Sequence, residues 1–381
     1  MRILYDFRAY QVYKQRGIAR YIYHMFESAI RQNSGPAYIL LYQNDIEPHF
    51  SPEVTSKVIF RYQETFERRG YANETYDFFI IGSHFLPSLS AENAITSQYP
   101  AAVMAASHKK ACILYDFIPL FFHQHIMSRD LEVSFAMQTE ALRYLDHIFP
   151  ISMFTLYSGI RYLNRPATDF TCLYGGADEK KFLTRNSGRP YEKKNRGPHL
   201  IYVGGDAPQK NTEGIVRAFC RAYRRDKLPE NARLYIVCRA SRAFIDTIRW
   251  ETSHTGCKYG KQVVATNYIP DKKMIELLST ARASIFPSFY EGLGLPILES
   301  YAAGTPCWAS GVSSTQELVL PECTFDPFDD ESMIQAVISI YQSEELCRKS
   351  LNFGRELLKW MNWDTGARKL LDACKRLSQE I

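Results

Sequence analysis

Short apolar runs typical of β-strands alternate along the chain with longer stretches in which apolar residues recur at helical spacing. In the first half, strand-like runs occupy residues 2–5, 38–42, 78–82 and 111–115, and helical patterns occupy residues 21–30 and 130–145. Strands separated by helices predict βαβ units, and such units build a parallel sheet. The first half of the chain therefore predicts an α/β domain.

The second half repeats this alternation after a break. Residues 184–198 are rich in charge, Gly and Pro, and we predict the domain boundary there, between an N-terminal domain of residues 1–185 and a C-terminal domain of residues 198–360. The strands expected in the second domain are 199–204, 234–238, 263–265 and 284–287, and the helices are 213–223, 271–279 and 295–303. The fold class is thus two doubly wound α/β domains, with ligands expected at the carboxyl ends of the strands, in a cleft between the domains.

Composition agrees with a globular protein. Of the 381 residues, 46% are hydrophobic and 23% are charged, which excludes disordered and fibrous classes. The net charge is 46 − 41 = +5, too weak a bias to indicate a nucleic-acid partner. An anionic small ligand and an anionic membrane surface fit this charge equally well.

The nine cysteines lie far apart in the sequence. No two are within four residues of each other, which excludes zinc ribbons and Cys-x-x-Cys motifs. We expect reduced core thiols in a cytoplasmic protein. The first residues are strand-like rather than a signal peptide, and no run of roughly 18 apolar residues predicts a membrane span.

Residues 285–306 hold the most informative pattern, a strand followed by a glycine-rich loop and a helix with Pro296 near its start. Backbone N–H groups at such a helix start attract an anion such as a phosphate. Glu291 lies in the loop and Glu299 about one turn inside the helix, so both carboxylates are positioned to hold a hydroxyl-rich sugar. The alternative is that Glu299 lies on the helix surface and the glycines only form a turn.

The spacing of Glu291 and Glu299, with Gly-Leu-Gly-Leu-Pro between them, resembles the retaining nucleotide-sugar glycosyltransferases of family 4, which have the GT-B fold. Residues 302–306 and 310–318 continue this resemblance. Further segments are similar to the same family in the same order, namely residues 17–21, 115–120, 202–211 and 362–368. The versions present here look most like bacterial mannosyltransferases of O-antigen or capsule assembly.

The resemblance implies a role for each matching residue. It implies that the last helix, within residues 361–381, packs back on the N-terminal domain. Glu291 would bind donor-sugar hydroxyls, Glu299 the ribose and Lys210 the diphosphate, whose charge grows as the glycosidic bond breaks. Catalytic roles would fall to Glu291, Lys210 and Asp116, and the donor-binding set would be Gly17, Gly205, Lys210, Glu291, Gly292, Leu293, Gly294, Leu295 and Glu299.

Two positions depart from the family pattern. Gly205 stands where the family commonly has an arginine, so the second diphosphate cation must come from elsewhere, with Arg239 as a candidate. Tyr115 replaces the histidine that precedes Asp116 in relatives.

No metal and no other cofactor are expected. His123 and His125 would share a face if this segment were a strand, but no third ligand is near in sequence, and the chain has no Asp-x-Asp triplet. The loop at Lys210 also lacks the glycine that a P-loop has before its lysine. The tyrosines of the N-terminal region have two open interpretations, an acceptor-lining cluster or ordinary packing; they are Tyr5, Tyr10, Tyr13, Tyr21 and Tyr23.

The resemblance thus predicts a cytoplasmic, metal-independent, retaining hexosyltransferase. It would move a sugar, with mannose from GDP-mannose as the first choice, to a glycan or lipid-linked oligosaccharide in bacterial surface polysaccharide synthesis. Peripheral contact with the inner face of the membrane is a further expectation, and no nucleic-acid partner is expected. The alternatives are a non-catalytic subunit that binds a glycan or nucleotide sugar, a nucleotide-sugar epimerase, and a phosphorylase.

Overall fold

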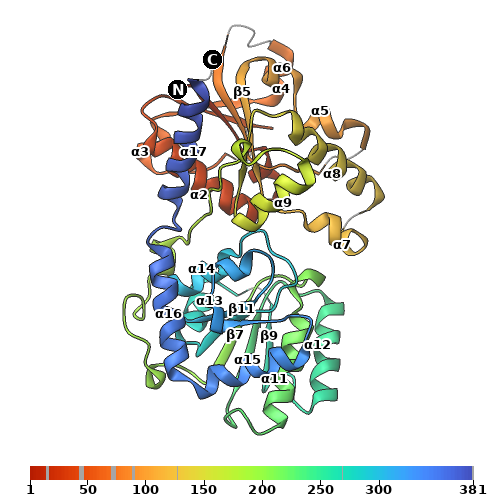
Figure 1. The fold of residues 1–381 in the computed structure, drawn as a ribbon, viewed down its shortest axis with the longest axis vertical. Coiled ribbons are helices and arrows are strands. Elements are labelled where there is room, and N and C mark those ends of the chain that lie inside the picture. The colour runs from red at the N-terminus through yellow and green to blue at the C-terminus, as the bar shows by residue number, and fades with distance from the viewer. Residues whose placement is uncertain are drawn as a thin grey trace. The chain divides into compact units, whose positions relative to one another are not determined.

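A computed structural model describes residues 1–13, 17–42, 47–69, 74–87, 91–126, 128–267 and 269–379. The chain divides into two compact units. Unit 1 comprises Met1–Gly175 and Met361–Ile381, and unit 2 comprises Gly176–Trp360. Figure 1 shows a central sheet covered by helices in each of them.

Unit 1 contains a six-stranded parallel sheet in the order β3-β2-β1-β4-β5-β6. Its strands are β1 (Ile3–Asp6), β2 (Ala37–Leu41), β3 (Val58–Tyr62), β4 (Tyr76–Ile81), β5 (Ser107–Leu114) and β6 (His147–Pro150). The helices described in this unit are α1 (Arg8–Tyr13), α2 (Gly17–Gln32), α3 (Pro52–Thr55), α4 (Gln63–Arg69), α5 (Ala94–Gln98), α6 (Ala101–Ala105), α7 (Ile118–Ile126), α8 (Arg129–Ala141), α9 (Met153–Leu163) and α17 (Trp363–Ser378). Every residue of β1 and β2 is buried, as expected for parallel strands covered on both faces.

Unit 2 repeats this architecture, with the strand order β12-β11-β10-β7-β8-β9. Its strands are β7 (His199–Val203), β8 (Arg233–Val237), β9 (Val263–Thr266), β10 (Ala283–Phe286), β11 (Cys307–Ser310) and β12 (Thr324–Phe325). Its described helices are α10 (Glu179–Phe182), α11 (Thr212–Arg224), α12 (Arg242–Thr255), α13 (Asp271–Thr280), α14 (Leu295–Ala302), α15 (Asp330–Gln342) and α16 (Glu344–Leu358). Numbered from its first strand, each sheet follows the 3-2-1-4-5-6 order of a Rossmann fold. The doubly wound α/β prediction is therefore confirmed for both units.

The pattern of apolar residues located the long elements well and misread one segment. Residues 121–125 were considered as a strand that would place His123 and His125 on one face, and this is wrong, because the backbone there belongs to helix α7. The segment looks like a strand in the sequence because bulky aromatic residues are typical of strands. The side chains of His123 and His125 lie outside the described part of the chain.

The change from unit 1 to unit 2 comes at Gly175, ahead of the boundary expected near residue 185. The reason is packing: Phe182 belongs to the apolar core of unit 2. Thr184 Oγ1 donates to the carbonyl of Ala303 at 2.9 Å, and Ser187 Oγ to that of Ala302 at 2.6 Å. The charged segment after residue 184 is therefore attached to unit 2.

Helix α17 returns to unit 1 and packs against α2 (Figure 1). Asn362 caps its N-terminus by accepting from Thr365 N at 2.9 Å. Asp364 bonds to Ser28 and Arg31, and Gln32 Nε2 donates to the Asp364 carbonyl at 3.0 Å. Gly366 allows close approach, because an added Cβ would lie 2.7 Å from Met25 Cε.

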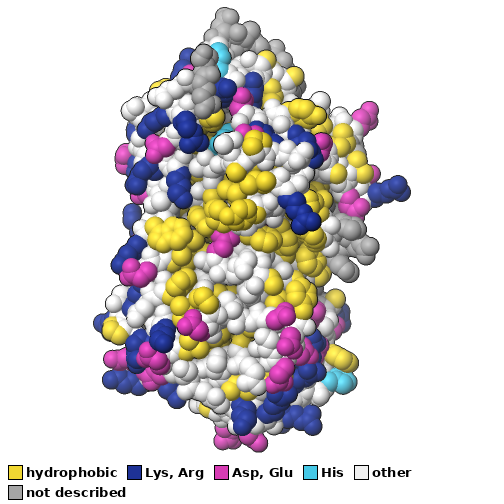
Figure 2. Space-filling view, in the orientation of Figure 1, with side chains coloured by type: hydrophobic (Ala, Val, Ile, Leu, Met, Phe, Trp, Pro, Cys, Tyr) yellow, Lys and Arg dark blue, Asp and Glu magenta, His cyan; other side chains and the backbone are white. Residues whose placement is uncertain are grey.

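The cysteines, the hydropathy of the helices and the surface charge complete the description of the fold. All nine cysteines are free thiols and eight are buried. Among the described residues, no helix combines the length and the apolar character that crossing a membrane requires. On the face shown in Figure 2, basic and acidic side chains are interspersed over unit 2.

Candidate active site

The centre of the unit 2 sheet brings together the two loops that the sequence marked as functional. Strands β7 and β10 are neighbours, and the direction in which the chain adds strands reverses between them. In open α/β sheets such a switch point leaves a crevice at the carboxyl ends of the strands. Lys210 lies in a short turn after β7, and Glu291 lies in the loop after β10.

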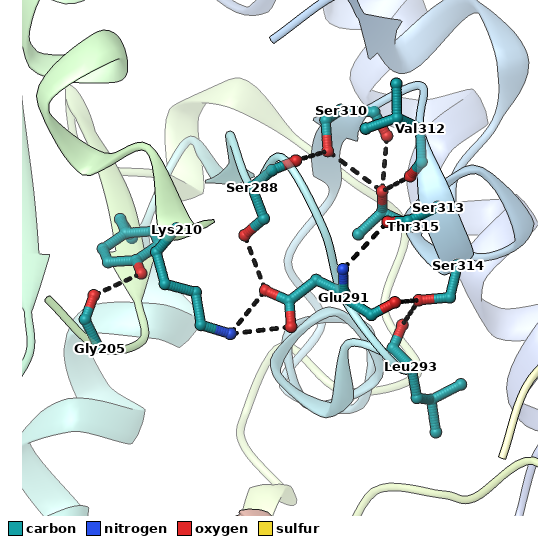
Figure 3. A network of polar contacts seen from close by, with 11 residues as sticks. Gly205, Lys210, Ser288, Glu291, Leu293, Ser310, Val312, Ser313, Ser314 and Thr315 are labelled. Atoms are coloured by element: carbon teal, nitrogen blue, oxygen red, sulfur yellow. Dashed lines mark hydrogen bonds and ion pairs between the residues drawn. The ribbon is translucent and has the colours of Figure 1, made fainter. Parts of the chain in front are cut away.

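Lys210 and Glu291 form a direct ion pair. Lys210 Nζ lies 2.7 Å from Glu291 Oε1 and 2.8 Å from Oε2, and Ser288 Oγ donates to Oε1 at 2.7 Å. Figure 3 shows the Lys210 and Ser288 side chains converging on this carboxylate. The Lys210 and Glu291 side chains are 24% and 16% exposed, so both are held in place yet reachable by a ligand. The opposite charges compensate each other.

Hydroxyl groups from the loop after β11 fix the backbone that carries Glu291. Glu291 N donates to Ser313 Oγ at 3.1 Å. Ser314 Oγ donates to the carbonyls of Glu291 and Leu293, at 2.9 and 3.0 Å. Ser313 adopts a left-handed conformation with φ of 53°, which is costly for a residue other than glycine and indicates a tightly determined turn.

A second layer of hydroxyls supports this turn (Figure 3). Ser310 Oγ donates to the Ser288 carbonyl at 2.6 Å, and Thr315 Oγ1 donates to the Val312 carbonyl at 2.6 Å. No role for these serines and threonines could be predicted from the sequence. Residues 310–318 carried two signals, their resemblance to the family and a run of small hydroxyl residues directly after a strand.

Helix α14 begins at the rim of the same pocket. Gly294 is its N-cap, with φ of 106°, a conformation that favours glycine, and Pro296 occupies its first turn. The small pocket above these residues is lined by Tyr202, Val203, Gly204, Lys210, Phe286, Glu291, Gly294, Pro296, Ile297 and Thr315. A ligand in this pocket would meet a lysine, a carboxylate and the start of a helix, which together suit a phosphorylated sugar.

Glu299 lies on the buried side of α14, and its residue is only 3% exposed. The alternative that Glu299 is a surface carboxylate is therefore wrong. Gly292, Leu293 and Gly294 connect Glu291 to Leu295, the first residue of this helix; donor binding by these four residues stays a prediction.

Two hydrogen bonds hold the loop that carries Lys210, one from Tyr202 and one from the backbone of Phe289. Tyr202 Oη donates to the Gly205 carbonyl at 2.8 Å, and burial raises the pKa of Tyr202, which keeps the phenol protonated. Gly204 approaches this ring so closely that an added Cβ would collide with Tyr202 Oη. Phe289 N donates to the Gln209 carbonyl at 2.7 Å, which ties the Lys210 turn to the Glu291 loop.

Asp116, Gly17 and the tyrosine cluster belong to unit 1. Asp116 Oδ1 accepts from Ile118 N at 2.9 Å at the start of α7, and Gly17 is the first residue of α2. Tyr115 is buried, and its hydroxyl donates to the Gly82 carbonyl at 3.0 Å.

The five tyrosines of that cluster differ in how far their side chains are exposed to solvent. Tyr5 and Tyr21 are core residues, whereas Tyr10, Tyr13 and Tyr23 are half-buried. Only the half-buried three still fit the acceptor-lining interpretation, and Tyr23 stacks on Phe50 at 5.5 Å between ring centroids. Among the described residues, no three His, Cys, Asp or Glu side chains are grouped as metal ligands.

The residues of this site lie in a segment that is similar to a known protein family. Residues 197–343 match the family described as "Glycosyl transferases group 1". Over 182 residues the chain is 28% identical to the O-antigen chain mannosyltransferase B of Escherichia coli, covering 47% of this chain and 46% of that protein. It is 22% identical over 284 residues to the serotype-specific mannosyltransferase WbdA of Escherichia coli, covering 71% of this chain and 34% of the relative. The chain thus matches less than half the length of either relative.

Solved structures extend the likeness of fold to the whole chain. The crystal structure of Anabaena HepE in complex with UDP and glucose superimposes with a TM-score of 0.71 at 12% identity, covering 99% of this chain and 100% of HepE. The chain therefore has the GT-B fold, and the part of it that matches the glycosyl transferases group 1 family, residues 197–343, includes Lys210, Glu291 and Glu299.

Proposed function

We propose that this protein is a retaining glycosyltransferase that moves mannose from GDP-mannose to a hydroxyl of a glycan in bacterial surface polysaccharide synthesis. The observation that carries the proposal is the Lys210–Glu291 pair at the switch point of unit 2, beside the N-terminus of α14. The names of the mannosyltransferase relatives support the choice of sugar. The free thiols fit a reaction in the cytoplasm.

Each group of the site has a part in the proposed reaction. The bond between the anomeric carbon and the diphosphate oxygen breaks, and a bond to the acceptor oxygen forms on the same face of the sugar. The acceptor proton passes to the departing phosphate oxygen. Lys210 stabilises the growing negative charge of the diphosphate, as do the amide groups at the start of α14.

The carboxylates orient the donor. Glu291 accepts hydrogen bonds from donor-sugar hydroxyls, and Ser288 and Lys210 hold that carboxylate ready. Glu299, which lies on α14, accepts hydrogen bonds from the ribose hydroxyls of the nucleotide. Because these groups are positioned before the substrate arrives, little reorganisation accompanies bond breaking. Asp116 and Gly17 are proposed to contribute from unit 1, and the positive charge is proposed to come from side chains rather than from a metal.

The test is the stereochemistry and the residue dependence of transfer. Purified protein is incubated with GDP-mannose and p-nitrophenyl α-mannoside, and the anomeric configuration of the product is read by NMR. We expect an α-linked product. Glu291→Gln should lower kcat/KM by about 100-fold, the size of effect seen when one preorganised transition-state contact is lost.

The matched control is Glu213→Gln, the same exchange of a carboxylate for a carboxamide at an exposed residue of α11 outside the pocket. This control should retain activity. A β-linked product would refute retention, and equal activity of Glu291→Gln and the wild type would refute the site assignment.

A further inference from the structure

A cavity at the amino-terminal edge of the unit 1 sheet takes no part in the proposed reaction. Its volume is about 610 Å³, the size of a small-molecule site, and all its lining residues belong to unit 1. Asp146 and His147 line it where β6 begins, and Arg376 lines it near the end of α17. In a parallel sheet this edge is opposite to the carboxyl ends of the strands, where ligands of α/β domains ordinarily bind.

The two carboxylates that line this cavity are already held by donors of the protein. Asp146 Oδ2 accepts from Lys110 N at 2.8 Å, and Asp146 Oδ1 lies 3.4 Å from Lys109 Nζ. Asp169 Oδ2 accepts from Arg165 Nε at 2.8 Å and lies 2.7 Å from Arg165 Nη2. Neither carboxylate therefore needs a cation from a ligand.

Arg376 gives the cavity a positive charge that these carboxylates do not match. The residue is exposed, and within the described ranges of the chain no carboxylate lies at ion-pair distance from its guanidinium. Its charge reaches His147, since burial and then the neighbouring Arg376 lower the pKa of that ring to about 4. Because Lys109 and Arg165 compensate the two carboxylates, the charge of Arg376 is left for a ligand.

His147 adds a buried ring with one unused nitrogen. The residue is 1% exposed, and its Nε2 lies 2.9 Å from Thr171 Oγ1. Its Nδ1 is buried and has no hydrogen-bond partner among the described residues, which is rare for a buried polar atom. Because Thr171 holds a ring that lines the cavity, the ring protons of His147 report on an occupant.

We propose that this cavity binds a phosphate group, held by the Arg376 guanidinium together with the hydroxyls of Thr168 and Thr171. A guanidinium presents two parallel N–H donors to phosphate oxygens. Both threonines line the cavity, so their hydroxyls add to the donors of Arg376. A phosphate monoester has three acceptor oxygens and uses more donors than a carboxylate does. Phe170 and Leu377 supply the apolar part of the lining, against which the remainder of the ligand packs.

The test follows the ring protons of His147 by NMR during titration with inorganic phosphate. Their resonances are assigned by their loss in His147→Gln. We expect a saturable shift in the wild type, and a midpoint at least about 10-fold higher in Arg376→Ala, because a hydrogen bond to a charged group is lost. Arg376→Lys keeps the charge and should lose less affinity. The matched control is Arg368→Ala, at an exposed arginine of the same helix outside the cavity, which should titrate like the wild type.

Vesicles that contain phosphatidic acid, a phosphate monoester, distinguish the source of the phosphate. If the source is a lipid head group, Arg376→Ala should sediment with the vesicles less than the wild type and Arg368→Ala do. If the source is a soluble phosphate ester, the three proteins should sediment alike, while Arg376→Ala still loses affinity for inorganic phosphate.

Two results with the wild type and Arg376→Ala would overturn the proposal, namely no saturable shift of His147 in the wild type and an unchanged midpoint in the variant. Phosphate bound at Lys210 is a separate event, so Lys210→Ala should leave the His147 shift unchanged. Loss of the shift in Lys210→Ala would assign the effect to the donor pocket and would also overturn the proposal. Because Arg376 is exposed, its replacement should leave the melting temperature unchanged.

Discussion

Single polar side chains determine where Glu291 points. Ser288 bonds to its carboxylate, and Ser313 and Ser314 bond to its backbone. The sequence predicted Lys210 and Glu291, because their charge and spacing within glycine-rich loops are distinctive. It did not predict the serines, because a hydroxyl that bonds a distant carbonyl looks the same in sequence as one that faces solvent. Such contacts arise only when three separate loops meet.

Buried histidines make the stability of unit 1 depend on pH. Burial lowers the pKa of His84 to about 3 and that of His147 to about 4, from an ordinary value of 6.5. Both rings stay neutral when folded, and in the unfolded chain they take up protons below pH 6.5. Stability is therefore full above that value and falls with decreasing pH.

The expected loss between pH 7 and pH 5 is about 2 kcal/mol for each histidine. Urea unfolding followed at pH 7, 6 and 5 measures it, and His147→Gln should make the dependence less steep. Unfolding curves that coincide at all three pH values would contradict the assignment of neutral buried rings.

At the scale of elements, helix packing positions the second carboxylate. Helix α16 meets α14 at Gly354, where an added Cβ would collide with the ring of Tyr301. Tyr301 lies two residues beyond Glu299 on α14. The close approach of the two helices therefore fixes the rotation of the helix that carries Glu299.

Gly354→Ala should destabilise unit 2 by about 1–3 kcal/mol, the usual cost of overpacking, and weaken donor binding. Helix propensity alone predicts the opposite sign, because alanine favours a helix over glycine. Thermal unfolding and a donor titration measure both effects. Asn352→Ala, at an exposed position of α16, is the control and should change neither. An increase in stability of Gly354→Ala would show that the helices are not in close contact.

Elements with strong periodicity could be predicted, and short or partly exposed ones could not. The apolar runs at β1, β2 and β7 stand out because both faces of each strand are covered. Strand β12 has only two residues and β3 is partly exposed, so neither leaves a clear pattern. At the N-terminus of α15, Asp329 Oδ1 accepts from Glu331 N at 2.9 Å and caps the helix.

For the whole molecule, the same strand order appears twice in one chain. Alternating strands and helices were enough to predict this architecture, because parallel strands need crossover helices on both faces. The end of unit 1 was harder to predict. Residues 184–198 look like a linker by composition, yet Thr184 and Ser187 attach them to unit 2, and Phe182 just before them already lies in its core.

Unit 2 is proposed to bind a nucleotide sugar through Lys210 and Glu291. The most direct measurement is thermal unfolding with GDP-mannose, UDP-glucose, UDP-N-acetylglucosamine and a dTDP-sugar. A donor at 100 times its Kd adds about 2.7 kcal/mol of stability. We predict stabilisation by GDP-mannose that disappears in Lys210→Ala. Unchanged melting with every donor, or equal stabilisation of wild type and Lys210→Ala, would contradict the claim.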